Sequence, residues 1–67
     1  MPQDSCQPIR DFIEQIETEI RELTDLLPEL PPSQRPVTKL HIADLKRQRT
    51  RMKQALKACM EAKRTGV

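Results

Sequence analysis

The sequence predicts an all-α fold, and more specifically an antiparallel hairpin of two helices. The chain of 67 residues contains one Gly, one Phe and no Trp or Tyr, so it offers few of the residues that favour strands. It is rich in Leu, Glu, Gln, Lys and Arg, which favour helices. On both sides of a proline-rich segment, apolar residues recur at alternating spacings of four and three, which is the heptad pattern of packed helices.

The first predicted helix covers about residues 5–27. Its apolar residues form a seam with heptad spacing, and Phe12 and Leu26 widen this seam beyond the stripe of an isolated two-stranded coiled coil. A broader apolar face of this kind is typical of a helical bundle. The seam residues are Ile9, Ile13, Ile16, Ile20, Leu23 and Leu27.

The start of this helix has two candidate caps. Ser5 is a reasonable N-cap, because Pro8 then falls in the first turn, where its missing N–H costs nothing. Asp4, followed by Gln7 three residues later, is the alternative. With either cap, Cys6 is expected in the first turn.

A proline-rich corner follows. Pro28 removes a backbone donor and disfavours helical geometry at the residue before it, so the first helix should end there. The predicted corner, about residues 28–37, holds four of the six prolines. We expect the second helix over about residues 38–64, with Thr38 as its cap; a start at Ser33, which puts Pro36 in the first turn, is the alternative.

The seam of the second helix is interrupted by Arg49, whose charge is expected to reach the edge of the hairpin along its apolar stem. A corner of about ten residues joins the two helices, which favours an antiparallel pair. The other seam residues are Ile42, Leu45, Met52, Leu56 and Cys59.

Cys6 and Cys59 fall on the two facing seams. With Thr38 as the cap, the numbers of two residues that face each other across the hairpin add to about 65. Cys6 and Cys59 then lie at the same height along the helix axes. With Ser33, they are displaced by about four residues, or roughly 6 Å of helix rise, and a bridge is strained or forbidden. Three interpretations stay open: two small apolar residues, an intramolecular disulfide, or a reactive thiolate at Cys6.

Charge divides sharply along the chain. Residues 1–33 carry eight acidic and two basic residues, whereas residues 34–67 carry ten basic and two acidic ones. The two halves therefore attract each other, and the basic side chains of the second helix are expected to form a solvated face partly paired with the first. The alternative is contact with nucleic-acid phosphates through Lys46, Arg47, Arg51, Lys53 and Lys57.

The segment "TKLHIADLKRQRTRMKQALKACM", residues 38–60, resembles the YdcH-like family of short bacterial helical proteins, and residues 13–23 are similar to the helix that precedes it in that family. The resemblance implies a helical hairpin. It implies no activity, because the function of the family is not established. The matching positions are Thr38 for the cap, Leu45, Lys46 and Arg49 for the leucine and basic positions, and Met52, Lys53 and Leu56 for the later stretch.

Several function classes find no support in the sequence. Two helices enclose no catalytic pocket, and there is no glycine-rich loop, paired carboxylate motif or histidine dyad, so we expect no enzyme. His41 is the only histidine, which leaves too few ligands for zinc, and we expect no metal or cofactor. The N-terminal residues contain no apolar run, so a cytoplasmic protein with reduced thiols and no membrane contact is expected.

A protein–protein interaction module is the function that these features favour, because a chain this short needs a partner or a staple. We expect a homodimeric four-helix bundle, or an adaptor or chaperone-like subunit; nucleic-acid binding is the alternative, and a redox-responsive hairpin is the third candidate. Apolar residues left near the hairpin edges are Phe12, Leu26, Val37, Leu40, Met60, Ala55 and Ala62. The expected interface residues are Ile9, Phe12, Ile13, Ile16, Ile20, Leu23, Leu26, Leu45, Met52 and Leu56.

Overall fold

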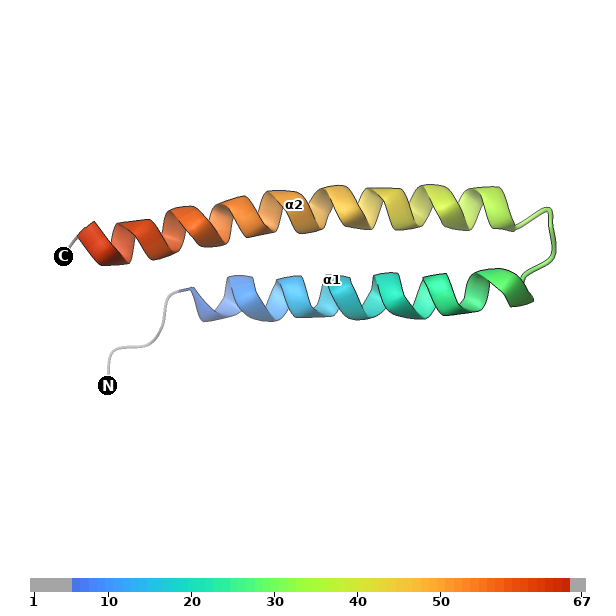
Figure 1. The fold of residues 1–67 in the computed structure, drawn as a ribbon, viewed down its shortest axis with the longest axis horizontal. Coiled ribbons are helices and arrows are strands. Elements are labelled where there is room, and N and C mark those ends of the chain that lie inside the picture. Colours follow the sequence, from blue (N-terminus) through green and yellow to red (C-terminus); the bar gives the residue numbers. More distant parts are fainter. Residues whose placement is uncertain (1–5, 66–67) are drawn as a thin grey trace.

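The computed structural model describes the backbone of residues 6–65 and the side chains of residues 6–63. Helix α1 spans Gln7–Leu26, a 3-10 turn (η1) spans Leu27–Glu29, and helix α2 spans Arg35–Thr65. The two long helices run side by side in opposite directions, with the corner at one end and the first residues of α1 and the last of α2 at the other (Figure 1). The described residues thus form the all-helical hairpin that the sequence predicts.

Cys6 is the N-cap of α1. Its carbonyl oxygen accepts a hydrogen bond from the Arg10 N–H at 3.1 Å, and Pro8 stands in the first turn, as expected. The side chain of Cys6 makes no capping hydrogen bond. The two caps expected from the sequence, Ser5 and Asp4, lie outside the described residues.

The second helix begins earlier than expected. Helix α2 starts at Arg35, three residues before the favoured position 38. The carbonyl oxygen of Gln34 accepts hydrogen bonds from both the N–H and the hydroxyl of Thr38, at 3.1 and 3.0 Å, so Thr38 lies inside the helix and does not cap it. Pro36 occupies the first turn, where its missing N–H costs nothing, as in the Ser33 alternative.

The register of the hairpin is nevertheless the one expected with Thr38. Cys6 and Cys59 form a disulfide with their Cα atoms 6.0 Å apart. The prediction that this register requires the second helix to start at Thr38 was therefore wrong. The turn η1 continues the first helix by three residues, Leu27–Glu29. This extension compensates for the start of α2 three residues early, so the same residues face each other across the hairpin.

Arg35 holds the corner together. Its Nε donates a hydrogen bond to the Leu30 carbonyl oxygen at 3.0 Å, and its Nη2 donates to the Pro28 carbonyl oxygen at 3.3 Å. The prolines leave this loop short of backbone donors, so a guanidinium is a suitable partner for its carbonyl groups. The first basic residue of α2 thus fixes the direction in which the chain returns.

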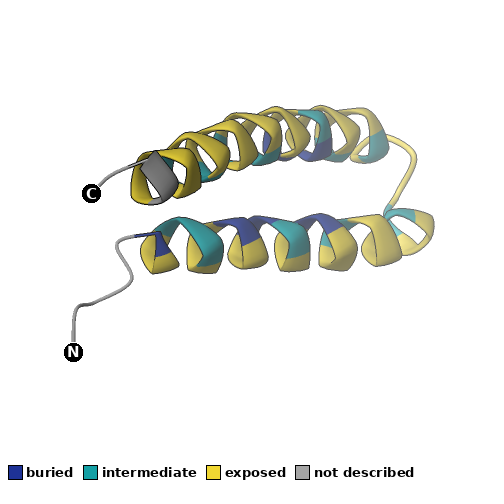
Figure 2. Ribbon diagram, turned by 60° about the vertical axis from the view of Figure 1, so that its left-hand side comes forward, coloured by how far each residue is buried: buried dark blue, intermediate teal, exposed yellow. Residues whose placement is uncertain are grey.

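The core is a narrow strip between the helices, seen as dark blue segments on their facing sides in Figure 2. Six side chains are buried among the described residues, and one cluster of four lies toward the corner half of the hairpin. The cluster is formed by Ile16, Ile20, Ile42 and Leu45, with Leu23, Leu27 and Met52 packed against it.

Candidate interaction surface

The ten residues expected at an interface divide into three groups. Four of them, Ile13, Ile16, Ile20 and Leu45, are buried inside the single hairpin. In the single hairpin these four are covered because the facing seams of α1 and α2 pack against each other, and their place at an intermolecular interface stays a prediction. The half-buried members are Ile9, Leu23, Met52 and Leu56, and the exposed ones are Phe12 and Leu26.

The apolar residues expected near the edges are all exposed. Phe12 is 44% exposed, Leu26 42% and Met60 43%, while Val37 and Leu40 near the corner are more exposed still. Ala55 and Ala62 are exposed as well. The prediction that one hairpin leaves these side chains uncovered is therefore confirmed.

One side of the hairpin carries both exposed apolar residues of α1. Leu26 lines a shallow hollow together with Leu23, Glu19, Glu22 and, from the other helix, His41. Residues seven apart lie on nearly the same side of a helix, so steps of seven extend this side along both helices. We call it the Phe12 face; it comprises Phe12, Glu19 and Leu26 from α1, and His41, Gln48, Ala55 and Ala62 from α2.

The opposite side is basic. One hollow there is bordered by Thr24 and Leu27 from α1 and by Lys39, Ile42, Ala43 and Lys46 from α2. A second hollow toward the open end is lined by Lys53, Leu56, Lys57, Met60 and Glu61. Lysines follow each other at steps of seven on this side, which we call the lysine face; it is defined by Lys39, Lys46, Lys53 and Met60.

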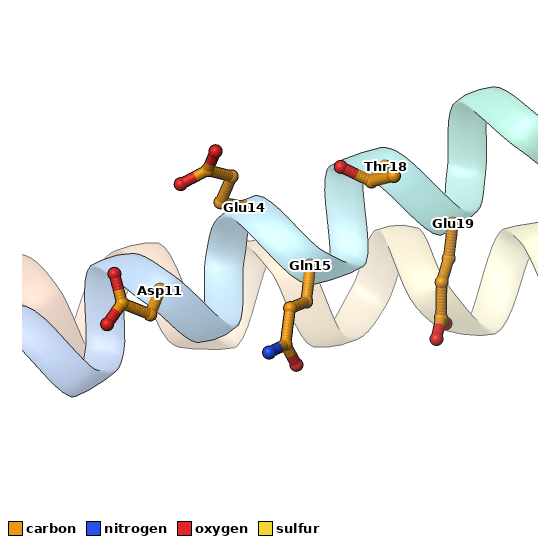
Figure 3. A pocket seen from close by; sticks show the side chains of 5 residues that line it. All are labelled: Asp11, Glu14, Gln15, Thr18 and Glu19. Carbon is orange, nitrogen blue, oxygen red and sulfur yellow. The ribbon is translucent and has the colours of Figure 1, made fainter.

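The hollow shown in Figure 3 belongs to α1 alone. Asp11, Glu14, Gln15, Thr18 and Glu19 line it, and their side chains spread in different directions over the outer surface of the helix. The carboxylate of Asp11 accepts a hydrogen bond of 2.8 Å from the side-chain amide of Gln7. No group of three or more His, Cys, Asp or Glu residues that could hold a metal ion occurs in the described part of the chain. This surface is an acidic helix face.

The five basic residues considered for nucleic-acid contact are all exposed. Arg47 lies 3.7 Å from Asp44 on its own helix, and both side chains are so exposed that this ion pair contributes little to stability. The other four (Lys46, Arg51, Lys53 and Lys57) make no ion pair within 4 Å among the described residues. Arg49 is half-buried, in agreement with a stem lying along the seam.

The disulfide closes the open end of the hairpin. Cys6 is fully buried and Cys59 is half-buried, so α1 and α2 cover most of the bridge. Of the three interpretations of the two cysteines, the intramolecular disulfide is the one found in the structure. The expectation of reduced thiols was therefore wrong. Disulfides are typical of oxidising compartments, so the bridge gives no support to the expected cytoplasmic location, which stays a prediction.

No family model, curated protein or solved structure matches this chain. The resemblance to the YdcH-like family therefore stays an expectation. Within the described residues, neither helix has a stretch that is long and apolar enough to cross a membrane.

The exposed apolar residues lie on different sides of the hairpin, which was not predicted from the sequence. The signal is present in the spacing, because Phe12 and Leu26 are fourteen residues apart, as are His41 and Ala55. Met60 belongs to the lysine face instead. Sorting these residues by heptad position separates the two faces.

Proposed function

We propose that this protein is a non-enzymatic interaction module that associates with a second copy through the Phe12 face, forming a four-helix bundle. The observation that carries the proposal is the pair of large apolar side chains on one side of α1, Phe12 and Leu26, each more than two-fifths exposed in the single hairpin. Helices of bundles bury a third row of apolar residues beside the two seam rows.

The energetics of the single hairpin support the same conclusion. Only six described side chains are buried, whereas five large apolar side chains of the hairpin are exposed. A standard interface buries about 800 Å² on each partner, and an interface of this size on one face would cover Phe12 and Leu26. Burying an apolar side chain fully is worth about 1.5–3 kcal/mol, and Phe12 and Leu26 would each gain part of that.

Changing Phe12 to Glu should dissociate the dimer, because a charge would enter the apolar part of the interface. The matched control is Met60→Glu, since Met60 is 43% exposed against 44% for Phe12 but lies on the lysine face. Sedimentation equilibrium is expected to give a monomer for Phe12→Glu and a dimer for Met60→Glu, both with the helical circular dichroism of the unmodified chain. Dissociation by the Met60 change alone would contradict the proposal.

Nucleic-acid binding is the second candidate. Its support is the set of exposed basic residues on α2, most of which make no close ion pair with described acidic residues. Helix α2 carries ten basic and two acidic residues, and each phosphate contact would release counterions. The described part contains one aromatic residue, Phe12, so contact with the backbone of a duplex is favoured over stacking on bases.

A titration with duplex DNA separates this candidate from pure protein–protein interaction. If the candidate holds, binding weakens steeply with salt, and Arg47→Glu with Arg51→Glu reduces it at least tenfold at low salt. The matched control, Glu14→Lys, changes charge on α1 and should leave an α2-mediated contact in place. Duplex binding that is unaffected by the Arg47 and Arg51 changes would reject α2 as the binding element.

A further inference from the structure

We infer that the two hairpins of the dimer lie with their corners at the same end, so that α1 of each copy packs against α2 of the other. This inference rests on the proposed self-association and adds the orientation of the partner. It follows from the distribution of charge between the two helices and from the heights of the large and small residues on the Phe12 face.

Two symmetric arrangements bring the Phe12 faces of two hairpins together. A twofold axis along the hairpin places both corners at one end and sets each α1 opposite the partner's α2. A twofold axis across the hairpin places the corners at opposite ends and sets α1 against α1 and α2 against α2. A twofold dimer of two-helix hairpins joined face to face has only these two helix pairings to choose from.

Charge favours the first arrangement. Helix α1 contains six acidic and two basic residues, a formal charge of −4, whereas the ten basic and two acidic residues of α2 give +8. With the corners together, each acidic helix faces a basic one, twice over in the dimer. With the corners apart, two α2 helices of net charge +8 would lie side by side. Their lysine faces point away from the contact, so the repulsion that opposes this arrangement acts through the net charges of the two helices.

Side-chain size favours the same arrangement. Residues whose numbers add to about 65 lie at the same height, as the Cys6–Cys59 bridge shows. When the corners lie together, the same residue of each copy lies at the same height along the dimer. Phe12 of one copy therefore lies near the level of Ala55 of the other. The small side chain of Ala55 leaves room for the ring. Leu26 comes to the level of His41 and the exposed Val37.

A distance between the two corners tests this orientation directly. Glu29 is exposed in the corner, and Glu29→Cys can carry a spin label in the bridged chain, where Cys6 and Cys59 are not free to react. Double electron–electron resonance should give a label-to-label distance of roughly 25 Å or less, because helices in bundles lie about 8–10 Å apart. Corners at opposite ends would give a distance of roughly 40 Å, because α2 of 31 residues sets the length of the hairpin at about 46 Å, and such a distance would overturn the inference.

A label at the exposed Thr18, near the middle of α1, is the matched control, because Thr18→Cys should give a short distance in both arrangements. A short distance at Thr18 with a long one at Glu29 overturns the orientation and leaves the dimer intact. If neither position gives an intermolecular distance and the mass is that of a monomer, the proposed self-association itself fails.

Discussion

Replacing Ile16 by Asp is expected to unfold the hairpin. Ile16 is 3% exposed and belongs to the cluster with Ile20, Ile42 and Leu45. Burying a carboxylate at this position costs its hydration, and removing the isoleucine costs the apolar contacts of the core. Together these losses destabilise the hairpin by at least about 4 kcal/mol. A hairpin with so small a core cannot compensate a loss of this size. We expect the helical circular dichroism signal at 25 °C to collapse and the proposed self-association to be lost with it.

Thr18→Asp is the control for this change, because Thr18 lies two residues further on the exposed side of the same helix. The Thr18→Asp change introduces the same negative charge at an exposed position, and Asp and Thr have similar helix propensities. The Thr18 variant should keep the helicity and mass of the unmodified chain. An Ile16→Asp variant that keeps both as well would show that the described core does not hold the hairpin together.

Removing the disulfide should lower the free energy of unfolding by about 4 kcal/mol in the chain-entropy model, because the bridge closes a loop between residues 53 apart in sequence. The variant Cys6→Ala with Cys59→Ala is suitable, since the Cys6 side chain makes no capping hydrogen bond that alanine would lose. Urea unfolding followed by circular dichroism should show the midpoint falling sharply.

Reductant supplies the matching control for the bridge. It should shift the unfolding midpoint of the unmodified chain toward that of the double alanine variant and leave the variant itself unchanged. A midpoint that neither reductant nor the substitutions move would contradict the stabilising role of the bridge. If reduction also weakens self-association, the third candidate, a redox-responsive hairpin, gains its first support, because the core cluster lies toward the corner and the bridge holds the open end.

The arrangement of the helices could be predicted from spacing alone. Ile13, Ile16 and Ile20 repeat at intervals of three and four, and all three are buried in the hairpin. The matched heights of Cys6 and Cys59 on facing seams made a bridge one of three open interpretations, and the structure has that bridge. The helix pairing was predictable because periodicity and a single short connection leave a helical pair little freedom.

The details of the corner could not be predicted in the same way. Thr38 looks like a cap, but the carbonyl oxygen of Gln34 already accepts the hydrogen bonds that start the helix, and Arg35 supplies donors to the loop. Such contacts depend on the three-dimensional path of the chain, which residue types alone do not specify. For the same reason, Ile16 and Phe12 look alike as apolar residues, although one is buried within the hairpin and the other is exposed.

Both the Phe12 interface and the orientation of the two hairpins depend on the proposed association of the hairpin with a second copy of itself. Sedimentation equilibrium of the bridged, unmodified chain over a range of micromolar concentrations measures this association. We expect a mass of twice 7.8 kDa, falling toward the monomer value on dilution as the association equilibrium shifts. A mass of 7.8 kDa at every concentration would contradict the claim.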